Sequence, residues 1–159
     1  MGWKSNIYKC SIPPEAVPVG NEFKYLLHFI FMLIIYTDGA CFGNPGPMGI
    51  GVVVYKDNKK IMEISEYAGE GTNNKAEYLA LIRALEIAKK LGETEVHIRT
   101  DSQLIERQIK GEYKVKNQGL KPLKAKADKL MSEMKVKVEH VSREKNEEAD
   151  ELSKRAVST

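Results

Sequence analysis

Four carboxylates, spread over about 110 residues, constrain the fold of this chain more than any other feature. Each stands at the end of an apolar strand or on a helix face that we expect to pack on a sheet. Such positions converge in space when strands and helices form layers. Carboxylates that share one place repel each other unless a cation neutralises them, and hard oxygen ligands select Mg²⁺ or Mn²⁺. The sequence therefore predicts a divalent-metal site formed by Asp38, Glu77, Asp101 and Asp150.

Glu77 gives the sharpest signal, because a carboxylate on a buried helix stripe is costly unless it is paired or metal-bound. Taken alone, each acid has a simpler interpretation. Asp38 is a turn residue, Glu77 a helix-start glutamate, Asp101 a helix cap and Asp150 an exposed acid. The joint pattern favours a site. At helical spacing, the stripe shared with Glu77 comprises Ala80, Leu81, Ala84, Ala88 and Leu91.

The order of predicted elements indicates an α/β fold with a mixed five-stranded sheet and helices packed on it. The strand at 33–37 shows no alternation, so we expect it to be central and covered on both faces. Residues 1–31 show no period, and we expect a loosely ordered extension before a domain at 32–157. The strands are expected at 33–37, 50–55, 60–67, 96–100 and 136–141, and the helices at 75–91, 102–110, 120–134 and 146–156.

Composition is that of an ordinary globular chain of 159 residues, with 42% hydrophobic and 30% charged residues. Cys10 and Cys41 lack metal-site spacing, which indicates a reducing compartment and a cytoplasmic location. The apolar stretch at 25–36 is too short to span a membrane, and no small-residue cleavage site follows it.

Lysines are concentrated between Lys110 and Lys129, a segment that contains seven Lys and only two acidic residues. The net charge of +3 does not by itself indicate nucleic-acid binding. A solvated helix face is the ordinary interpretation of the lysines, and a surface that follows phosphates is the alternative.

Four segments together resemble the type 1 ribonuclease H family, whose members cut the RNA strand of RNA–DNA hybrids. They read TDGACFGNPGPMGIG at 37–51, GTNNKAEYLALIRAL at 71–85, TDSQ at 100–103 and NEEADELS at 146–153. The resemblance covers 32–157. It implies the ribonuclease H-like fold, in which the first three strands are antiparallel, the last two are parallel to the first, and helices cover both faces.

The resemblance also implies the catalytic chemistry. The four acids match the residues that bind two Mg²⁺, with Mn²⁺ able to substitute, around the scissile phosphate. One ion would activate the attacking water, and the other would stabilise the leaving 3′ oxygen. Cleavage would leave 5′-phosphate and 3′-hydroxyl ends.

The substrate residues come from the same resemblance. Five positions match those that line the minor groove of the hybrid and test for 2′-hydroxyl groups: Cys41, Asn44, Asn73, Asn74 and Gln103. Thr72 and Asn73, with Lys75 beside them, match the pocket for a DNA-strand phosphate. Without the resemblance, residues 72–74 would cap the following helix, a role they can fill at the same time. The expected partner is an RNA–DNA hybrid bound by a monomer, with double-stranded RNA left open.

Two departures from the family pattern affect these expectations. Many bacterial members carry a loop His before the last acid, whereas residues 142–145 here contain none. We expect Arg143 to take over part of this catalytic role by holding a phosphate, and His140 to be structural. The second departure is the segment 111–119, which is too short for the basic handle of bacterial members. The lysines noted above would supply a weaker grip. Both departures resemble the archaeal subgroup of the family.

Two other classes of function remain open from the sequence. A non-catalytic hybrid- or RNA-binding module would have no need for four repelling acids. Another nuclease of the same superfamily would have no need for the minor-groove set Asn44, Asn73, Asn74 and Gln103.

Overall fold

The computed structural model describes residues 32–158, so the expected extension at 1–31 lies outside the described residues. The strands are β1 (Leu33–Cys41), β2 (Gly46–Lys56), β3 (Lys59–Gly71), β4 (Glu95–Thr100) and β5 (Lys135–His140). The helices are α2 (Asn73–Lys90), α3 (Gln103–Ile109), α4 (Lys121–Met131) and α5 (Glu147–Val157), and a 3₁₀ turn η2 (Arg143–Asn146) precedes α5.

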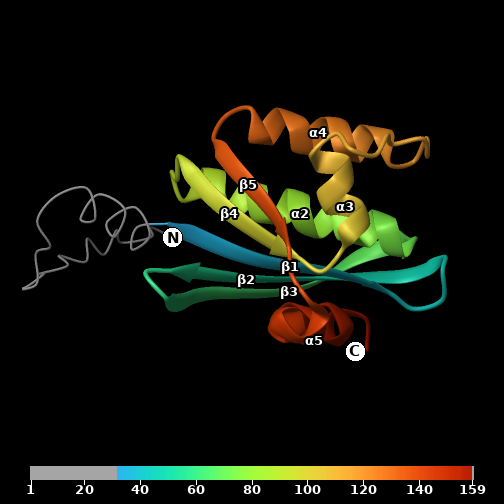
Figure 1. Cartoon of the computed structure of the whole chain (residues 1–159). Coiled ribbons are helices and arrows are strands. Elements are labelled where there is room, and N and C mark those ends of the chain that lie inside the picture. The colour runs from blue at the N-terminus through green and yellow to red at the C-terminus, as the bar shows by residue number, and fades with distance from the viewer. Residues whose placement is uncertain (1–31, 159) are drawn as a thin grey trace, which may run out of the picture.

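The strands form one mixed sheet in the order β3-β2-β1-β4-β5. β2 runs antiparallel to both β1 and β3. β4 runs parallel to both β1 and β5. Helices α2, α3 and α4 lie on one face of this sheet and α5 on the other (Figure 1). The expected fold class is therefore confirmed.

β1 is the central strand, and its apolar sequence explains that position. Leu33 and Ile35 are fully buried on the face that packs with α2. Ile34 and Tyr36 point to the other face and are only half-buried. They line an open pocket beside α5. The expectation that β1 is covered on both faces is thus wrong at its first residues, because α5 covers only part of that face among the residues that the structure describes.

α2 carries the expected buried stripe against the sheet. Its N-cap is Thr72, whose hydroxyl accepts a hydrogen bond from the backbone N–H of Lys75 at 3.3 Å. The stripe ends before Leu91, which is 42% exposed. The prediction that Leu91 belongs to the buried stripe is therefore wrong. The helix ends at Lys90, and Gly92 follows in the left-handed region at φ 74°, so the helical spacing no longer applies.

Other boundaries differ by a few residues from the expected ones. β2 and β3 are longer than predicted because their ladder continues to the pair Gly46 and Gly71. The last helix begins at Glu147, because the chain before it forms the turn η2. Within residues 32–158, no helix has both the length and the apolar composition needed to cross a membrane.

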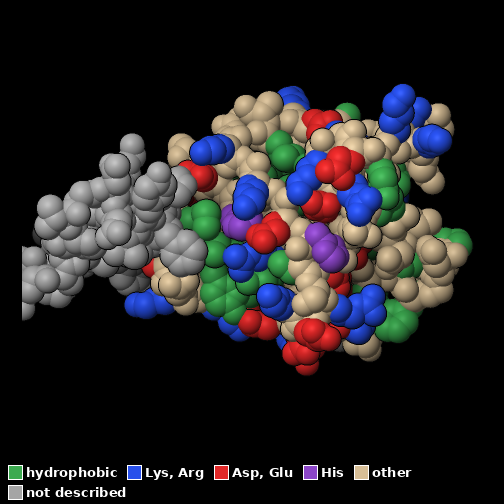
Figure 2. Space-filling model, in the orientation of Figure 1, with side chains coloured by type: hydrophobic (Ala, Val, Ile, Leu, Met, Phe, Trp, Pro, Cys, Tyr) green, Lys and Arg blue, Asp and Glu red, His purple; other side chains and the backbone are tan. Residues whose placement is uncertain are grey.

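The lysine-rich segment divides into two groups. Lys110, Lys124 and Lys126 form ion pairs with Glu106, Asp128 and Glu86 respectively, as expected for a solvated helix surface. A second group is exposed and comprises Lys114, Lys116, Lys121 and Lys129. In Figure 2, Lys and Arg side chains stand out at the upper right, over the connection between α3 and α4.

Candidate active site

Asp38 lies in the middle of the sheet, where a close approach between β1 and α2 brings it near Glu77. Gly39 makes this approach possible. A Cβ atom on Gly39 would lie 2.3 Å from the backbone carbon of Ala76 and 2.4 Å from the backbone nitrogen of Glu77. Any other residue at position 39 would therefore push α2 away from the strand.

Three of the four predicted acids converge. One carboxylate oxygen from each of Asp38, Glu77 and Asp101 lies within 4.8 Å of the other two. Asp38 and Glu77 are buried, at 4% and 7% exposure. Asp101 follows β4 directly, and its side chain is 10% exposed. Ser102 caps α3 instead of Asp101, because the Ser102 hydroxyl accepts from the backbone N–H of Ile105. Asp101 is thus left available for the cluster.

Burial and mutual repulsion make this cluster unfavourable without a positive partner. The pKa of Asp38 rises from its ordinary value of 3.8 to about 7, mainly through burial and then through the charges of Asp101 and Asp150. The pKa of Glu77 lies well above its usual range, because the carboxylate is buried and faces Asp38 and Asp101. Gly39 donates one backbone hydrogen bond to Glu77, but the Oε2 atom of Glu77 is buried without a partner.

This arrangement fits a divalent cation. The donor set consists of hard carboxylate oxygens, and one of them is buried with no hydrogen bond. A cation between the three groups would remove the repulsion and satisfy the Glu77 oxygen.

Asp150 lies beside the three converging acids, at a greater distance. It is close enough to raise the pKa of Asp38 through its charge. Its own Oδ2 atom forms an ion pair with Lys154 at 2.7 Å, one helical turn further along α5. The buried Asn146 fixes the start of this helix, because its Nδ2 atom donates to the carbonyl of Thr37, next to Asp38, at 2.9 Å.

The raised pKa of Asp38 predicts how the stability of the metal-free protein depends on pH. The folded state binds this proton more tightly than the unfolded state, so stability falls as pH rises through about 7. Between pH 6 and pH 8 in excess chelator, we expect a loss of about 1 kcal/mol and of about 3 °C in melting temperature. Differential scanning fluorimetry at the two pH values would measure the shift in melting temperature.

Two comparisons isolate the contribution of Asp38. In Asp38→Asn the loss between pH 6 and pH 8 should become smaller, because Asn does not titrate while the buried Glu77 keeps a raised pKa. Millimolar Mg²⁺ should remove the loss in the wild type. An equal loss in the variant would show that Asp38 is not its source. The buried Glu77, whose pKa also lies well above its usual range, would then be examined.

Arg143 lies at the edge of the acid cluster. Its Nε atom is 3.8 Å from Oδ2 of Asp101, and its side chain is 86% exposed, so it is free to turn toward a ligand. His140 ends β5 and is exposed. A structural role for His140 stays a prediction, to which burial adds no support.

Six of the seven predicted substrate residues lie in the turn between β1 and β2, at the end of β1 or at the start of α2, and the seventh, Gln103, begins α3. Asn44 joins these two segments, because its Oδ1 atom accepts from the backbone N–H of Asn73 at 3.1 Å. The Cys41 thiol lies 3.0 Å from the carbonyl oxygen of Gly43 and 3.2 Å from that of Gly71. Thr72, Asn73, Asn74 and Gln103 are exposed, and Lys75 is half-buried.

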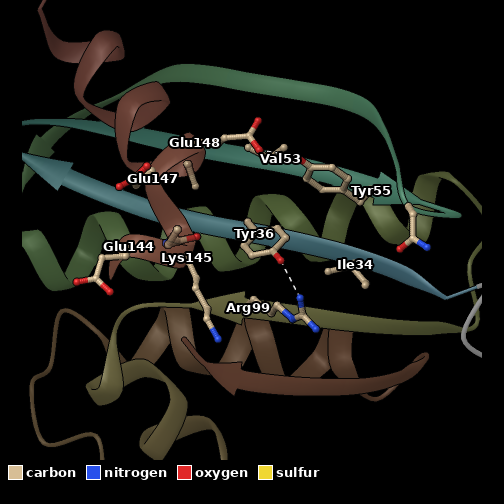
Figure 3. Close-up of a pocket in the computed structure, with 12 residues that line it drawn as sticks. Ile34, Tyr36, Val53, Tyr55, Arg99, Glu144, Lys145, Glu147 and Glu148 are labelled. Carbon is tan, nitrogen blue, oxygen red and sulfur yellow. Dashed lines mark hydrogen bonds between the residues drawn. The ribbon is translucent and has the colours of Figure 1, made fainter. Parts of the chain in front are cut away.

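A hollow that the sequence did not indicate lies on the α5 side of the sheet and has a volume of about 480 Å³. Its lining includes Tyr36, Tyr55, Arg99 and Lys145 (Figure 3). Arg99 donates to the Tyr36 hydroxyl at 2.7 Å, and Tyr55 donates to Glu148. None of the four acids lines it, so the hollow and the acid cluster are separate features.

The sheet order and the buried carboxylates define a chain of the ribonuclease H-like class. The family model described as reverse transcriptase-like matches residues 36–156. Ribonuclease HI of Halobacterium salinarum is 40% identical over 124 residues, which are 77% of this chain. The chain belongs to the type 1 ribonuclease H family.

Solved structures agree with this assignment. The crystal structure of RNase H1 from Halobacterium salinarum superimposes with a TM-score of 0.77 and 38% identity, over 79% of this chain and 97% of that one. LC11-RNase H1 in complex with an RNA/DNA hybrid gives a TM-score of 0.75 and 48% identity, over 79% and 96%.

Some relatives are considerably longer than the matched region. The chain spans 62% of the length of the Halobacterium ribonuclease HI. It spans 35% of a bifunctional protein of Mycobacterium tuberculosis that is 41% identical over 128 residues.

Proposed function

We propose that this chain is an endonuclease that hydrolyses the RNA strand of RNA–DNA hybrids and leaves 5′-phosphate and 3′-hydroxyl ends. The observation that carries the proposal is the convergence of Asp38, Glu77 and Asp101, with a buried Glu77 oxygen that has no partner. Burying like charges destabilises the folded protein, and a bound cation that serves a function offsets this destabilisation.

The proposed cofactor is a pair of Mg²⁺ ions, for which Mn²⁺ can substitute. When bound, the ions supply an activated water and stabilise the charge on the leaving 3′ oxygen. Asp38, Glu77 and Asp101 would hold the buried part of this site. Asp150 would complete it by exchanging its ion pair with Lys154 for the metal, which is feasible because that pair is partly exposed.

The proposed substrate surface extends from the acid cluster across the β1–β2 turn to the start of α2. Asn44 and Asn73 are already linked there, which holds two of the minor-groove contacts at a fixed spacing. Amide groups can donate to and accept from a ribose 2′-hydroxyl, the group that separates RNA from DNA. Thr72 and Lys75 stand next to them for a DNA-strand phosphate, and the exposed lysines of the α3–α4 connection supply further positive charge.

The alternatives fit the geometry less well. In a non-catalytic binding module, the buried acids would destabilise the fold without serving a function. Another nuclease of the same superfamily would leave the linked Asn44 and Asn73 without a role. The relative crystallised with an RNA/DNA hybrid supports the hybrid as substrate.

The experiment that tests the function uses three labelled duplexes of one sequence: a hybrid, an RNA duplex and a DNA duplex. Each is incubated with Mg²⁺, with Mn²⁺ or with excess chelator. We expect cleavage of the hybrid with either metal and none with chelator. An uncut hybrid, bound by the protein, would support the binding module, and a cut DNA duplex would support the other nuclease. The RNA duplex decides whether double-stranded RNA is also a substrate.

Replacing Arg143 tests its proposed catalytic role. We expect Arg143→Ala to lower hybrid cleavage by about ten- to a hundredfold, because a phosphate-holding arginine assists without supplying the nucleophile. Steady-state kinetics on a short hybrid measure it, and Lys145→Ala, two residues along η2, is the matched control. An unchanged rate would assign Arg143 to the solvated surface and make the exposed His140 the next residue to test.

The domain boundary at residue 32 also remains a proposal. β1 begins at Leu33, so a chain that starts at Met32 contains every strand and helix described above. We expect this chain to keep hybrid cleavage within about twofold and its melting temperature within about 2 °C. Unfolding or loss of binding would place residues 1–31 within the functional domain.

Two further proposals concern the protein as a whole. We propose that it is a monomer, which size-exclusion chromatography of both chains tests. We also propose a cytoplasmic location, because the two cysteines suit a reducing compartment.

A further inference from the structure

Ser153 is a fully buried serine on the face of α5 that packs against the sheet. Its hydroxyl lies 2.5 Å from Oδ2 of Asp38 and 2.8 Å from the backbone carbonyl of Asp150. Ser153 is therefore in contact with one proposed metal ligand and with the backbone of another.

The close packing of α5 on β2 places the hydroxyl there. A Cβ atom on Gly49 would lie 2.2 Å from the carbonyl oxygen of Ser153, and one on Gly51 would lie 2.1 Å from that of Ala149. These two glycines let the helix backbone approach the strand closely. A serine hydroxyl then reaches across to Asp38, which is paired with Gly51 in the β1–β2 ladder.

A hydroxyl has one hydrogen to donate, so its two possible acceptors compete. Serines in helices commonly donate to the carbonyl three or four residues earlier. Ser158, the C-cap residue of the same helix, does so to Arg155, at 3.1 Å. Ser153 has this acceptor in Asp150 and, in addition, the carboxylate of Asp38. A carboxylate that binds a cation is ionised and is the stronger acceptor, so the hydrogen is then directed to Asp38.

The consequence for Asp38 is a fixed orientation. Among the described residues, Ser153 is the group whose hydrogen bond offsets the burial that raises the pKa of Asp38. Held at Oδ2 from the α5 side, the carboxylate keeps its Oδ1 atom and its remaining lone pairs for a cation shared with Glu77 and Asp101.

We propose that Ser153 is a positioning residue of the metal site, whose hydroxyl orients the Asp38 carboxylate toward the cation that Glu77 and Asp101 share. This inference rests on the proposed function of the acid cluster. It adds a ligand-orienting group, and such groups typically change metal affinity or activity by about ten- to a hundredfold.

The test measures Mn²⁺ binding by calorimetry in the absence of nucleic acid, so that it is independent of cleavage. We expect Ser153→Ala to weaken Mn²⁺ binding by at least about tenfold, and cleavage to recover when Mg²⁺ is raised. Ser158→Ala is the control, because it removes a hydroxyl from the exposed C-cap of the same helix, where the hydroxyl donates to a backbone carbonyl and contacts no carboxylate. It should bind Mn²⁺ like the wild type.

Two further variants keep the result interpretable. Ser153→Cys preserves the volume more closely and replaces the hydroxyl with a weak donor, so it should also weaken Mn²⁺ binding and serves if the alanine variant does not fold. In an Asp38→Asn background, Ser153→Ala should produce no further loss, because the two changes remove one interaction. Unchanged Mn²⁺ affinity in the folded Ser153 variants, or full additivity with Asp38→Asn, would overturn the proposal. A wild type that binds Mn²⁺ but leaves the hybrid uncut would refute the proposed function and not the role of Ser153.

Discussion

Asp101→Asn is expected to lower hybrid cleavage by two to three orders of magnitude while the fold persists. The substitution keeps the shape of the side chain and removes one of the three converging charges. Asp38 and Glu77 then no longer experience the charge of Asp101, so the metal-free variant should melt at the same temperature as the wild type or higher. Single-turnover cleavage and thermal melting in chelator measure the two effects.

The matched control is Asp57→Asn. Asp57 is an exposed residue of the β2–β3 turn at φ 54°, a conformation that Asn also tolerates, so activity and stability should stay the same. Cleavage at the wild-type rate by Asp101→Asn would refute a role for Asp101 in the metal site. A variant that loses activity and also unfolds would indicate a structural role instead.

The second large effect concerns the number of ribonucleotides in the substrate. If Asn44, Asn73, Asn74 and Gln103 contact successive 2′-hydroxyls, one ribonucleotide within a DNA duplex cannot satisfy them all. We expect cleavage to require about four consecutive ribonucleotides, as the family resemblance implies, and to fall by at least about a hundredfold for a single one. A series of duplexes with one to six consecutive ribonucleotides measures this dependence.

Asn44→Ala provides a sharper version of the same test. It removes an amide that reaches the backbone of Asn73, so it should raise KM for the hybrid more than it lowers kcat. Efficient cleavage at a lone ribonucleotide would point to the specificity of type 2 ribonucleases H and would contradict the proposed minor-groove contacts.

Much of this site could be predicted because strand ends and helix stripes are local patterns. Asp38 and Asp101 each lie at or beyond an apolar strand segment, and Glu77 shares a stripe with buried alanines. The parallel pairing of β1 with β4 brings the first two together. The cap at Thr72 followed from its residue type and its place before a helical pattern.

Tertiary contacts account for what the sequence did not indicate. The hydrogen bond from Ser153 to Asp38 joins residues 115 positions apart. It depends on the absence of side chains at Gly49 and Gly51, which no local pattern expresses. The ion pair of Asp150 with Lys154 follows a common helical spacing, but whether it competes with a metal depends on how α5 lies on the sheet. The hollow beside Tyr36 arises because α5 covers only part of that face within residues 32–158.

Strand-specific cleavage of one hybrid tests the central claim most directly. The same RNA–DNA hybrid is labelled at the 5′ end of its RNA strand in one sample and of its DNA strand in another, and both are incubated with Mg²⁺ or with excess chelator. We predict RNA fragments that end in a 3′-hydroxyl, an intact DNA strand, and no cleavage in chelator or by Asp101→Asn. Cleavage of the DNA strand, or RNA cleavage that persists in chelator, would contradict a metal-dependent ribonuclease built on Asp38, Glu77 and Asp101.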